Sequence, residues 1–183
     1  MKNPSPKQVW LILGGTRSGK SSYAQRLAET LWKKPLYLAA AEITDQEMAD
    51  RVRRHRKARC AAWLCAEEPL EVGRILAKPP ARADGILFDC VTIWLSNVMV
   101  KEGVTAMPRR EKGLLRALQQ SPRDVILVSN EVGLGIVPES KMGRTFRDRA
   151  GLLNQALAKA ADHVILIAAG LPLVLKGRLP ETS

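Results

Sequence analysis

The strongest chemical signal in the sequence is a glycine-rich segment close to its start. Eight consecutive residues follow the pattern G-x-x-x-x-G-K-[ST], and they are Gly14, Gly15, Thr16, Arg17, Ser18, Gly19, Lys20 and Ser21. In such a loop the backbone N–H groups point at phosphate oxygens, the lysine reaches the β and γ phosphates, and the final hydroxyl can bind Mg²⁺. An apolar segment precedes the loop and a helical pattern follows it, as this chemistry requires. We therefore expect a nucleotide-binding loop in which Lys20 is catalytic and Ser21 is a magnesium ligand.

Two acidic residues follow apolar segments that are typical of buried strands. Asp89 comes directly after residues 86–88, and Glu131 follows residues 125–129. Because P-loop enzymes hold Mg²⁺ with a carboxylate at the end of a neighbouring strand, we expect Asp89 to be a catalytic residue and a magnesium ligand. The alternative for Asp89 is a cap on the helix that follows. For Glu131 a catalytic base, a substrate contact and a structural role all stay open.

A basic segment surrounds one of the two histidines of the chain. Arg51, His55 and Arg59 are spaced four residues apart, so they share a face if the segment is helical. Neighbouring positive charges disfavour imidazolium, which would keep His55 neutral near pH 7, as a nucleophile must be. The arginines would also bind a triphosphate. On spacing alone, however, the pattern favours a solvated surface histidine. We expect His163, at the start of an apolar segment, to be structural.

Short apolar segments alternate with longer segments of helical periodicity along the chain. The apolar segments are too short and too continuous for surface helices, so they predict buried strands over residues 9–13, 36–40, 86–90, 125–129 and 164–168. The helical patterns cover residues 20–32, 45–58, 70–77, 92–100, 109–120 and 146–161, with predicted loops at 79–80 and 102–108. Strands that alternate with helices form parallel sheets. We therefore predict an α/β fold of the P-loop NTPase-like type, with a mostly parallel sheet and helices on both faces.

The size and composition of the chain bound its organisation. A length of 183 residues with 46% hydrophobic residues suits one domain. We predict a flexible tail over residues 1–8 and a single nucleotide-binding domain over residues 9–183. The apolar segments are shorter than the ~18 residues of a membrane-spanning helix, and the first residues lack the features of a signal peptide. We expect no membrane span, a cytoplasmic location, and reduced thiols at Cys60, Cys65 and Cys90.

The formal net charge of +11 suggests a different class of function, namely the binding of a polyanion. A basic protein can bind nucleic acid, a membrane surface or a polyanionic small molecule. Aromatic residues that could stack on bases are scarce, at 4% of the chain, and no nucleic-acid-binding motif is present. We therefore expect no nucleic-acid partner, and a basic nucleic-acid-binding protein stays as the less favoured alternative.

Several segments, taken together, carry a resemblance to one family. They are GGTRSGKS at 14–21, LYLAAAE at 36–42, RVRRH at 51–55, FDCVTIWLSN at 88–97 and SNEVGLGIVP at 129–138. In this order and spacing they resemble the bifunctional adenosylcobinamide kinase / adenosylcobinamide-phosphate guanylyltransferase family of cobalamin biosynthesis. The first segment alone is generic, whereas the segment that ends at Pro138 and the one that contains His55 are far more specific. The chain is similar to the family from about Leu11 to Lys176.

The resemblance implies two reactions. A nucleoside triphosphate, ATP or GTP, phosphorylates the aminopropanol hydroxyl of adenosylcobinamide, and GTP then donates GMP to that phosphate through a guanylylated histidine, giving adenosylcobinamide-GDP and pyrophosphate. By motif position, His55 is the catalytic residue that takes the GMP. The resemblance also implies nucleotide contacts from residues 14–21, Ala39, Ala40, Ala41, Arg56, Lys57, Ala58, Arg59, Glu67 and Asp89. It further implies a corrinoid substrate, Mg²⁺ as cofactor, and a homo-oligomer, with trimers known in the family.

One other function of the same broad class stays open. The chain departs from the family at Ala58-Arg59-Cys60, where members commonly carry Gly-Arg-Pro, and the segment between Asn97 and Pro122 is shorter than in many members. The alternative is a P-loop kinase of another small molecule, without guanylyltransferase activity and with an inert His55. A guanylylated protein discriminates between the two, because only the bifunctional enzyme forms one.

Overall fold

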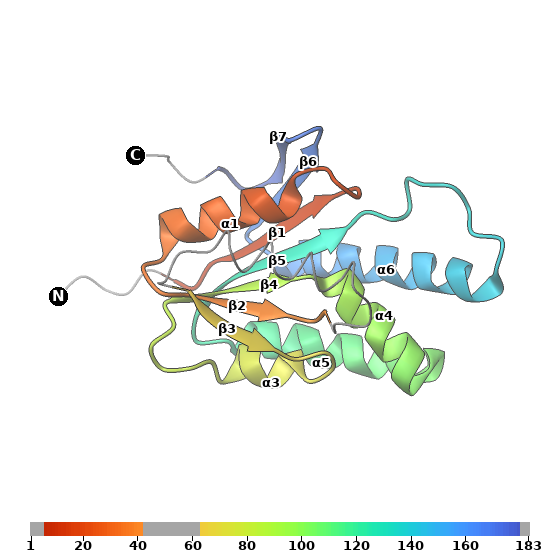
Figure 1. Cartoon of the computed structure of the whole chain (residues 1–183), viewed down its shortest axis with the longest axis horizontal. Helices are drawn as coiled ribbons and strands as arrows, with labels where there is room; N and C mark the ends of the chain where they lie inside the picture. The colour runs from red at the N-terminus through yellow and green to blue at the C-terminus, as the bar shows by residue number, and fades with distance from the viewer. Residues whose placement is uncertain (1–5, 42–62, 180–183) are drawn as a thin grey trace.

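A seven-stranded sheet forms the centre of the protein (Figure 1). The structure is a computed structural model, and it describes residues 6–41 and 63–179. The strands lie in the order β3-β2-β4-β5-β1-β6-β7. Their bounds are β1 Val9–Gly14, β2 Pro35–Ala39, β3 Leu64–Glu67, β4 Gly85–Asp89, β5 Asp124–Asn130, β6 His163–Ala168 and β7 Leu171–Lys176. Neighbouring strands are parallel except β6 and β7, which are antiparallel.

Helices cover both faces of this sheet. They are α1 Lys20–Leu31, α3 Val72–Ala77, α4 Val91–Glu102, α5 Met107–Gln120, α6 Lys141–Ala160 and the short 3₁₀ helix η1 Val104–Ala106. Helix α1 packs on one face of the sheet, and α3, α4, α5 and α6 pack on the other (Figure 1). The predicted α/β fold, with a mostly parallel sheet and helices on both faces, is therefore confirmed.

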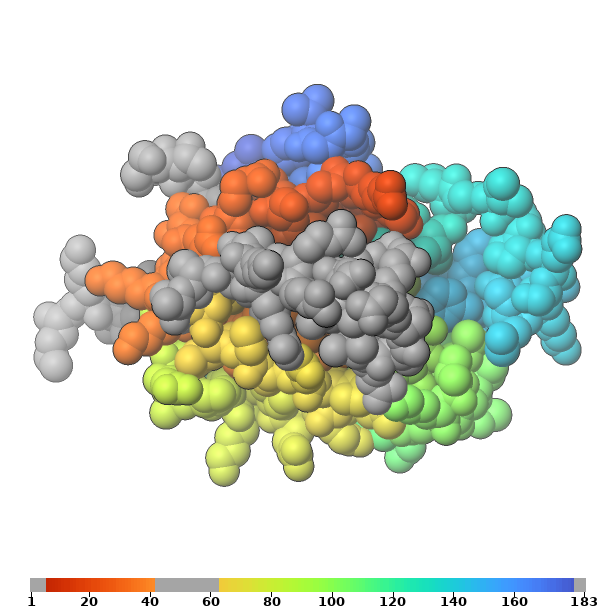
Figure 2. Space-filling model, in the orientation of Figure 1, coloured from red at the N-terminus to blue at the C-terminus, as the bar shows by residue number. Residues whose placement is uncertain are grey.

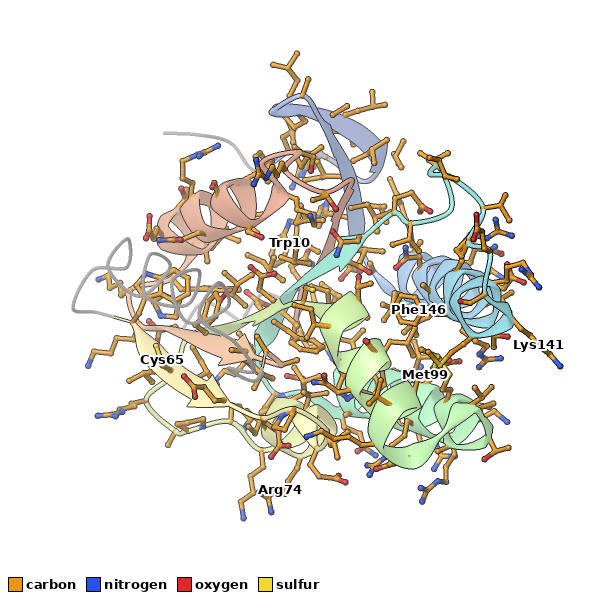
Figure 3. All side chains as sticks on the ribbon, turned by 45° about the vertical axis from the view of Figure 1, so that its right-hand side comes forward. Trp10, Cys65, Arg74, Met99, Lys141 and Phe146 are labelled. Atoms are coloured by element: carbon orange, nitrogen blue, oxygen red, sulfur yellow. The ribbon has the colours of Figure 1, made fainter. Side chains whose placement is uncertain are left out.

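Strand β1 shows why the sequence pattern predicted buried strands. All of its residues are buried. Val9, Leu11 and Leu13 pack under the helices α3 to α6, whereas Trp10 and Ile12 pack under α1. Figure 3 shows Trp10 between the sheet and α1. Because successive side chains of a strand point to opposite faces, a strand covered on both sides is apolar throughout rather than alternating.

Two strands and one helical segment were not predicted. Strands β3 and β7 lie at the two edges of the sheet; β3 has only four residues and ends at Glu67, and β7 contains Pro172, which is atypical of an inner strand. The loop predicted over 102–108 is wrong, because η1 follows α4 closely and α5 begins at Met107, with Pro108 in its first turn. Helix α6 begins five residues earlier than predicted, where the Ser140 hydroxyl accepts the N–H of Gly143 at 3.0 Å.

The tail predicted over residues 1–8 is described only from residue 6 onward. Lys7 Nζ donates to the carbonyl oxygens of Leu118 and Gln119 at 2.7 and 2.8 Å, so this residue lies against the end of α5. The helix predicted over 45–58 lies outside the described residues. The division into a tail and a single domain over residues 9–183 stays a prediction.

Candidate nucleotide-binding and catalytic site

The glycine-rich loop connects β1 to α1, which begins at Lys20. Gly14 must lack a side chain, because a Cβ there would lie 2.5 Å from Ser18 Oγ and 2.7 Å from the carbonyl oxygen of Ile167. Gly19, the N-cap of α1, has a φ of 95°, in the region that favours glycine. The loop is thus a narrow turn at a helix N-terminus, where unpaired backbone N–H groups are available to an anion.

Lys20 is the buried cation of this loop. The residue is 9% exposed, and its Nζ donates to the carbonyl oxygen of Gly15 at 3.1 Å. Burial lowers the pKa of Lys20, while the charges that Cys90 and Asp89 can carry raise it by a smaller amount. The Asp89 carboxylate is therefore near enough to act on the Lys20 ammonium. A bound phosphate would replace Gly15 as the partner of Lys20 and offset the unfavourable burial of its charge.

Ser18 supplies a second buried polar group. Its backbone is fixed on both sides, because its N–H donates to Gly15 at 3.2 Å and its carbonyl oxygen accepts from the N–H of Gly170 at 2.9 Å. Its Oγ is buried and has no hydrogen-bond partner among the described residues. A buried hydroxyl without a partner is unfavourable. The loop therefore carries one polar group that a ligand oxygen would satisfy.

Asp89 ends β4, and its surroundings differ from the expected ones in two respects. Strand β5 lies between β4 and β1, so Asp89 does not end the strand that neighbours the loop. The helix that follows is capped by Cys90, whose Sγ accepts the N–H of Ile93 at 3.4 Å, so the capping alternative for Asp89 is wrong. The Asp89 carboxylate instead accepts a hydrogen bond from the Tyr37 hydroxyl at 3.2 Å, and this bond orients it.

Three of the predicted nucleotide contacts meet where β2 ends. Ala39 is the last residue of β2, and it pairs with Asp89 of β4 on one side and with Glu67 of β3 on the other. The carbonyl oxygen of the next residue, Ala40, accepts from Asn97 Nδ2 at 2.8 Å. Asn97 is not among the site residues predicted from the sequence. Its side chain fixes the backbone after β2 from helix α4, a contact between distant segments that no local pattern indicates.

Glu131 follows β5, the strand that does neighbour β1. Its N–H donates to the carbonyl oxygen of Gly14 at 3.0 Å. One carboxylate oxygen accepts the N–H of Gly133 at 3.1 Å, and the other lies 3.5 Å from Asn154 Nδ2. Figure 2 shows the segment after β5, in teal, next to the red residues of the β1–α1 loop at one end of the molecule. A second carboxylate is therefore fixed beside the phosphate-binding loop.

The basic segment of the predicted site lies outside the described residues, after Ala41. It contains His55, Arg56, Lys57, Ala58 and Arg59. Their predicted roles stay predictions. The other histidine, His163, lies within 2.9 Å of Gln8 Oε1 through its Nε2 and stacks on Trp10, with the ring centroids 5.2 Å apart. These contacts give His163 the structural role expected of it.

The donor set predicted for Mg²⁺, Ser21 and Asp89, consists of oxygen atoms only. Ser21 lies in the first turn of α1, after Thr16 and Arg17 in the loop, and Asp89 ends β4. Within residues 6–41 and 63–179, no group of three or more His, Cys, Asp or Glu side chains could hold a metal by itself. Mg²⁺ usually takes one or two protein oxygens together with substrate phosphates and water. The residues present therefore fit an ion that arrives with the nucleotide.

The fold and this loop define the class of the protein as a P-loop nucleotide-binding enzyme. Among solved structures, the chain is similar to a prototypical ATPase from the type III secretion system of pathogenic bacteria, with a TM-score of 0.56 and 12% identity. The match covers 91% of this chain and 56% of that chain. At this identity the likeness concerns the fold alone. In the described part of the chain, no helix is both long enough and apolar enough to cross a membrane.

Sequence comparison gives the family. The model of the family described as cobinamide kinase / cobinamide phosphate guanyltransferase matches residues 10–175. The chain is 41% identical over 167 residues to the bifunctional adenosylcobalamin biosynthesis protein CobP of Pseudomonas aeruginosa, covering 91% of this chain and 96% of that protein. It is 38% identical over 179 residues to the bifunctional adenosylcobalamin biosynthesis protein CobU of Salmonella typhimurium, covering 91% and 98%. The chain belongs to the cobinamide kinase / cobinamide phosphate guanyltransferase family, and it is an enzyme of this kinase and nucleotidyltransferase class.

Proposed function

We propose that this chain phosphorylates the aminopropanol hydroxyl of adenosylcobinamide with ATP or GTP, and then transfers GMP from GTP to that phosphate. The observation that carries the proposal is the buried Lys20 inside a glycine-rich loop and close to Asp89, in a chain that matches the family over residues 10–175. The products are adenosylcobinamide-GDP and pyrophosphate. We place the protein in the cytoplasm, where nucleoside triphosphates are available.

The described residues divide the work of binding the triphosphate. The backbone of the loop from Gly14 to Gly19 and the start of α1 surround the phosphates, and Lys20 stabilises the charge that develops on them during transfer. Ser21 and Asp89 would hold Mg²⁺, which supplies additional positive charge to the phosphates when it is bound. Ala39 and Glu67, which pair at the end of β2, would contact the remainder of the nucleotide in this proposal.

The second reaction uses His55 as a nucleophile. A neutral imidazole nitrogen of His55 attacks the α phosphorus of GTP, the bond to the β phosphate oxygen breaks, and pyrophosphate leaves. The phosphate of the corrinoid then attacks the same phosphorus, which breaks the N–P bond and restores His55. Because the transfer occurs in two steps, the anionic GTP and the anionic corrinoid phosphate do not have to react with each other directly. The arginines around His55 reduce the repulsion between the anionic groups.

The covalent step can be tested directly. The purified protein is incubated with Mg²⁺ and GTP labelled in its α phosphate, denatured, and examined for retained label, with His55→Ala as the control. We expect label on the wild type only, in a bond that is labile to acid and stable to base, as a phosphoramidate is. A folded, GTP-binding wild type without label contradicts the covalent mechanism and favours a P-loop kinase of another small molecule.

The proposal includes a homo-oligomer, supported by the edge strand β7. This strand exposes large apolar side chains: Leu171 is 71% exposed, Leu173 55% and Leu175 56%. An exposed apolar edge strand offers both unpaired backbone groups and apolar area to a second copy. Sedimentation should give a mass above the 20.2 kDa of one chain, and Leu173→Lys should shift it toward the monomer. A wild type that is monomeric at micromolar concentration contradicts the oligomer.

A further inference from the structure

A buried network of polar side chains lies between β5, α4 and α6. Ser129 Oγ is 3.2 Å from Thr92 Oγ1 and donates to Asn154 Oδ1 at 2.7 Å. Asn154 Nδ2 in turn donates to the carbonyl oxygen of Asn130 at 3.1 Å and lies 3.5 Å from Glu131 Oε2. The three side chains inside the network are 2–7% exposed. Burying three polar side chains is unfavourable unless each finds its partners, so their placement is specific.

The network ends at the carboxylate of Glu131. Glu131 forms no ion pair among the described residues, and its oxygens are held by the N–H of Gly133 and by Asn154. Its backbone N–H is bonded to Gly14, the first residue of the phosphate-binding loop. The Glu131 carboxylate therefore has a fixed orientation beside the loop, and its oxygens keep the capacity to accept a further hydrogen bond.

Phosphoryl transfer to a hydroxyl needs a group that takes its proton. Lys20 carries positive charge toward the phosphates, and Asp89 already accepts from Tyr37 and fits the metal. We infer that Glu131 is the catalytic base of the kinase step and that Asn154 is its positioning residue. This inference rests on the proposed function. The bond from the substrate oxygen to the γ phosphorus forms, the bond from that phosphorus to the β–γ bridging oxygen breaks, the hydroxyl proton passes to Glu131, and the nucleoside diphosphate leaves.

The two reactions of the chain should need Glu131 unequally. In the kinase step the acceptor is a hydroxyl, which is a poor nucleophile until its proton is removed. In the guanylyl transfer the acceptor is a phosphate monoester, which is already largely ionised near pH 7 because its second pKa is about 6. Removing the base should therefore impair the first reaction and spare the second.

The experiment compares Glu131→Gln with the wild type in both reactions, with adenosylcobinamide phosphate supplied for the second. We expect kcat of the kinase step to fall about 100-fold or more, with KM for the triphosphate and the rate of guanylyl transfer changed by less than about threefold. Glu29→Gln is the matched control, since Glu29 also accepts a side-chain N–H, from Trp63 at 3.1 Å, near the other end of α1. This control should keep wild-type rates.

Each outcome of this comparison decides something. If the wild type phosphorylates no corrinoid, the proposed function fails and the inference fails with it. If the wild type performs both reactions and Glu131→Gln keeps its kinase kcat within threefold, the inference alone fails. Equal losses in both reactions would give Glu131 a role in nucleotide binding or folding instead, and would also overturn it.

The positioning role of Asn154 needs a separate readout. Asn154→Asp replaces the N–H donor by an acceptor, so kcat of the kinase step should fall about tenfold while KM for the triphosphate stays. In the Glu131→Gln background, Asn154→Asp should lower kcat of the kinase step hardly any further, because the carboxylate that Asn154 positions is already absent. Ser129→Ala, which removes the donor to Asn154, serves as a second variant if Asn154→Asp does not fold. Losses that multiply in the double variants would contradict positioning.

Discussion

The charge of the Asp89 carboxylate stabilises the ammonium group of Lys20. Asp89 ends β4 and Lys20 follows β1, and β5 lies between these two strands. Burial lowers the pKa of Lys20, and the negative charge of Asp89 partly opposes that effect. The sheet order places β5 between β4 and β1, so the two groups meet beyond the carboxyl ends of the strands. The protein thus holds a cation, which a phosphate would engage, and an anion, which Mg²⁺ would engage, at one end of the sheet.

Replacing the buried charge of Lys20 should weaken nucleotide binding without lowering the stability of the fold. Lys20→Met keeps the length of the side chain and removes the ammonium, so the affinity for a nucleoside triphosphate should fall roughly 10- to 100-fold. The variant should melt at or above the wild-type temperature, because the burial that lowers the pKa of Lys20 opposes its charge in the folded state. Calorimetric titration and thermal unfolding without nucleotide measure the two effects. A variant that melts well below the wild type would show that Lys20 stabilises the fold.

Asp89 and its hydrogen bond from Tyr37 should affect the Mg²⁺ concentration that the kinase reaction needs. Asp89→Asn removes the charged ligand, so the Mg²⁺ concentration for half-maximal kinase activity should rise about tenfold or more. Tyr37→Phe removes one hydrogen bond worth about 1 kcal/mol and should raise that concentration only a few-fold. Activity measured across a Mg²⁺ titration tests both. Identical Mg²⁺ curves for Asp89→Asn and the wild type would exclude Asp89 as the ligand.

The parts of the structure that the sequence predicted are those with local signals. The loop from Gly14 to Ser21 has a motif of its own, and the five inner strands that were predicted consist mainly of apolar residues because both faces are covered. The edge strand β3 has only four residues, and β7, although residues 171–175 are apolar, contains Pro172, which is atypical of an inner strand. An apolar pattern of sufficient length without a proline inside it is therefore what made the inner strands recognisable in the sequence.

The relationships that depend on strand order could not be predicted. Nothing in the segment around Asp89 indicates that β5 pairs with both β4 and β1, since this pairing joins segments far apart in the chain. The contact of Asn154 with Glu131 spans 23 residues and arises only when α6 packs over the end of β5. Both carboxylates were found from their positions after apolar segments, whereas the side chains that orient them were not.

Gly14 and Gly15 should respond differently to the same substitution. Gly14→Ala would place a Cβ 2.5 Å from Ser18 Oγ and 2.7 Å from a backbone oxygen, so the loop must shift, and triphosphate affinity should fall roughly 100-fold, or about 2.7 kcal/mol. A Cβ at Gly15 would meet no atom within 4 Å, so Gly15→Ala should cost much less. Fluorescent-nucleotide titration of the two variants tests this order. Equal losses would contradict the view that the close contacts around Gly14 shape the phosphate-binding loop.

Cys90 should make the stability of the protein fall at alkaline pH. Burial, with a smaller contribution from the charge of Asp89, raises the pKa of the Cys90 thiol from 9.0 to about 12. The thiol of the unfolded chain therefore ionises first as the pH rises, and its contribution to stability, full below pH 9, is lost between about pH 9 and 12.

The loss attributable to Cys90 should approach 1.4 kcal/mol per pH unit above pH 9. Denaturant unfolding at pH 8 and pH 10 measures it, with Cys90→Ala as the reference for all other titrating groups. The wild type should lose roughly 1 kcal/mol more than Cys90→Ala between the two values. Equal losses would mean that Cys90 ionises in the folded protein as readily as in the unfolded chain, and that the end of β4 is open to water.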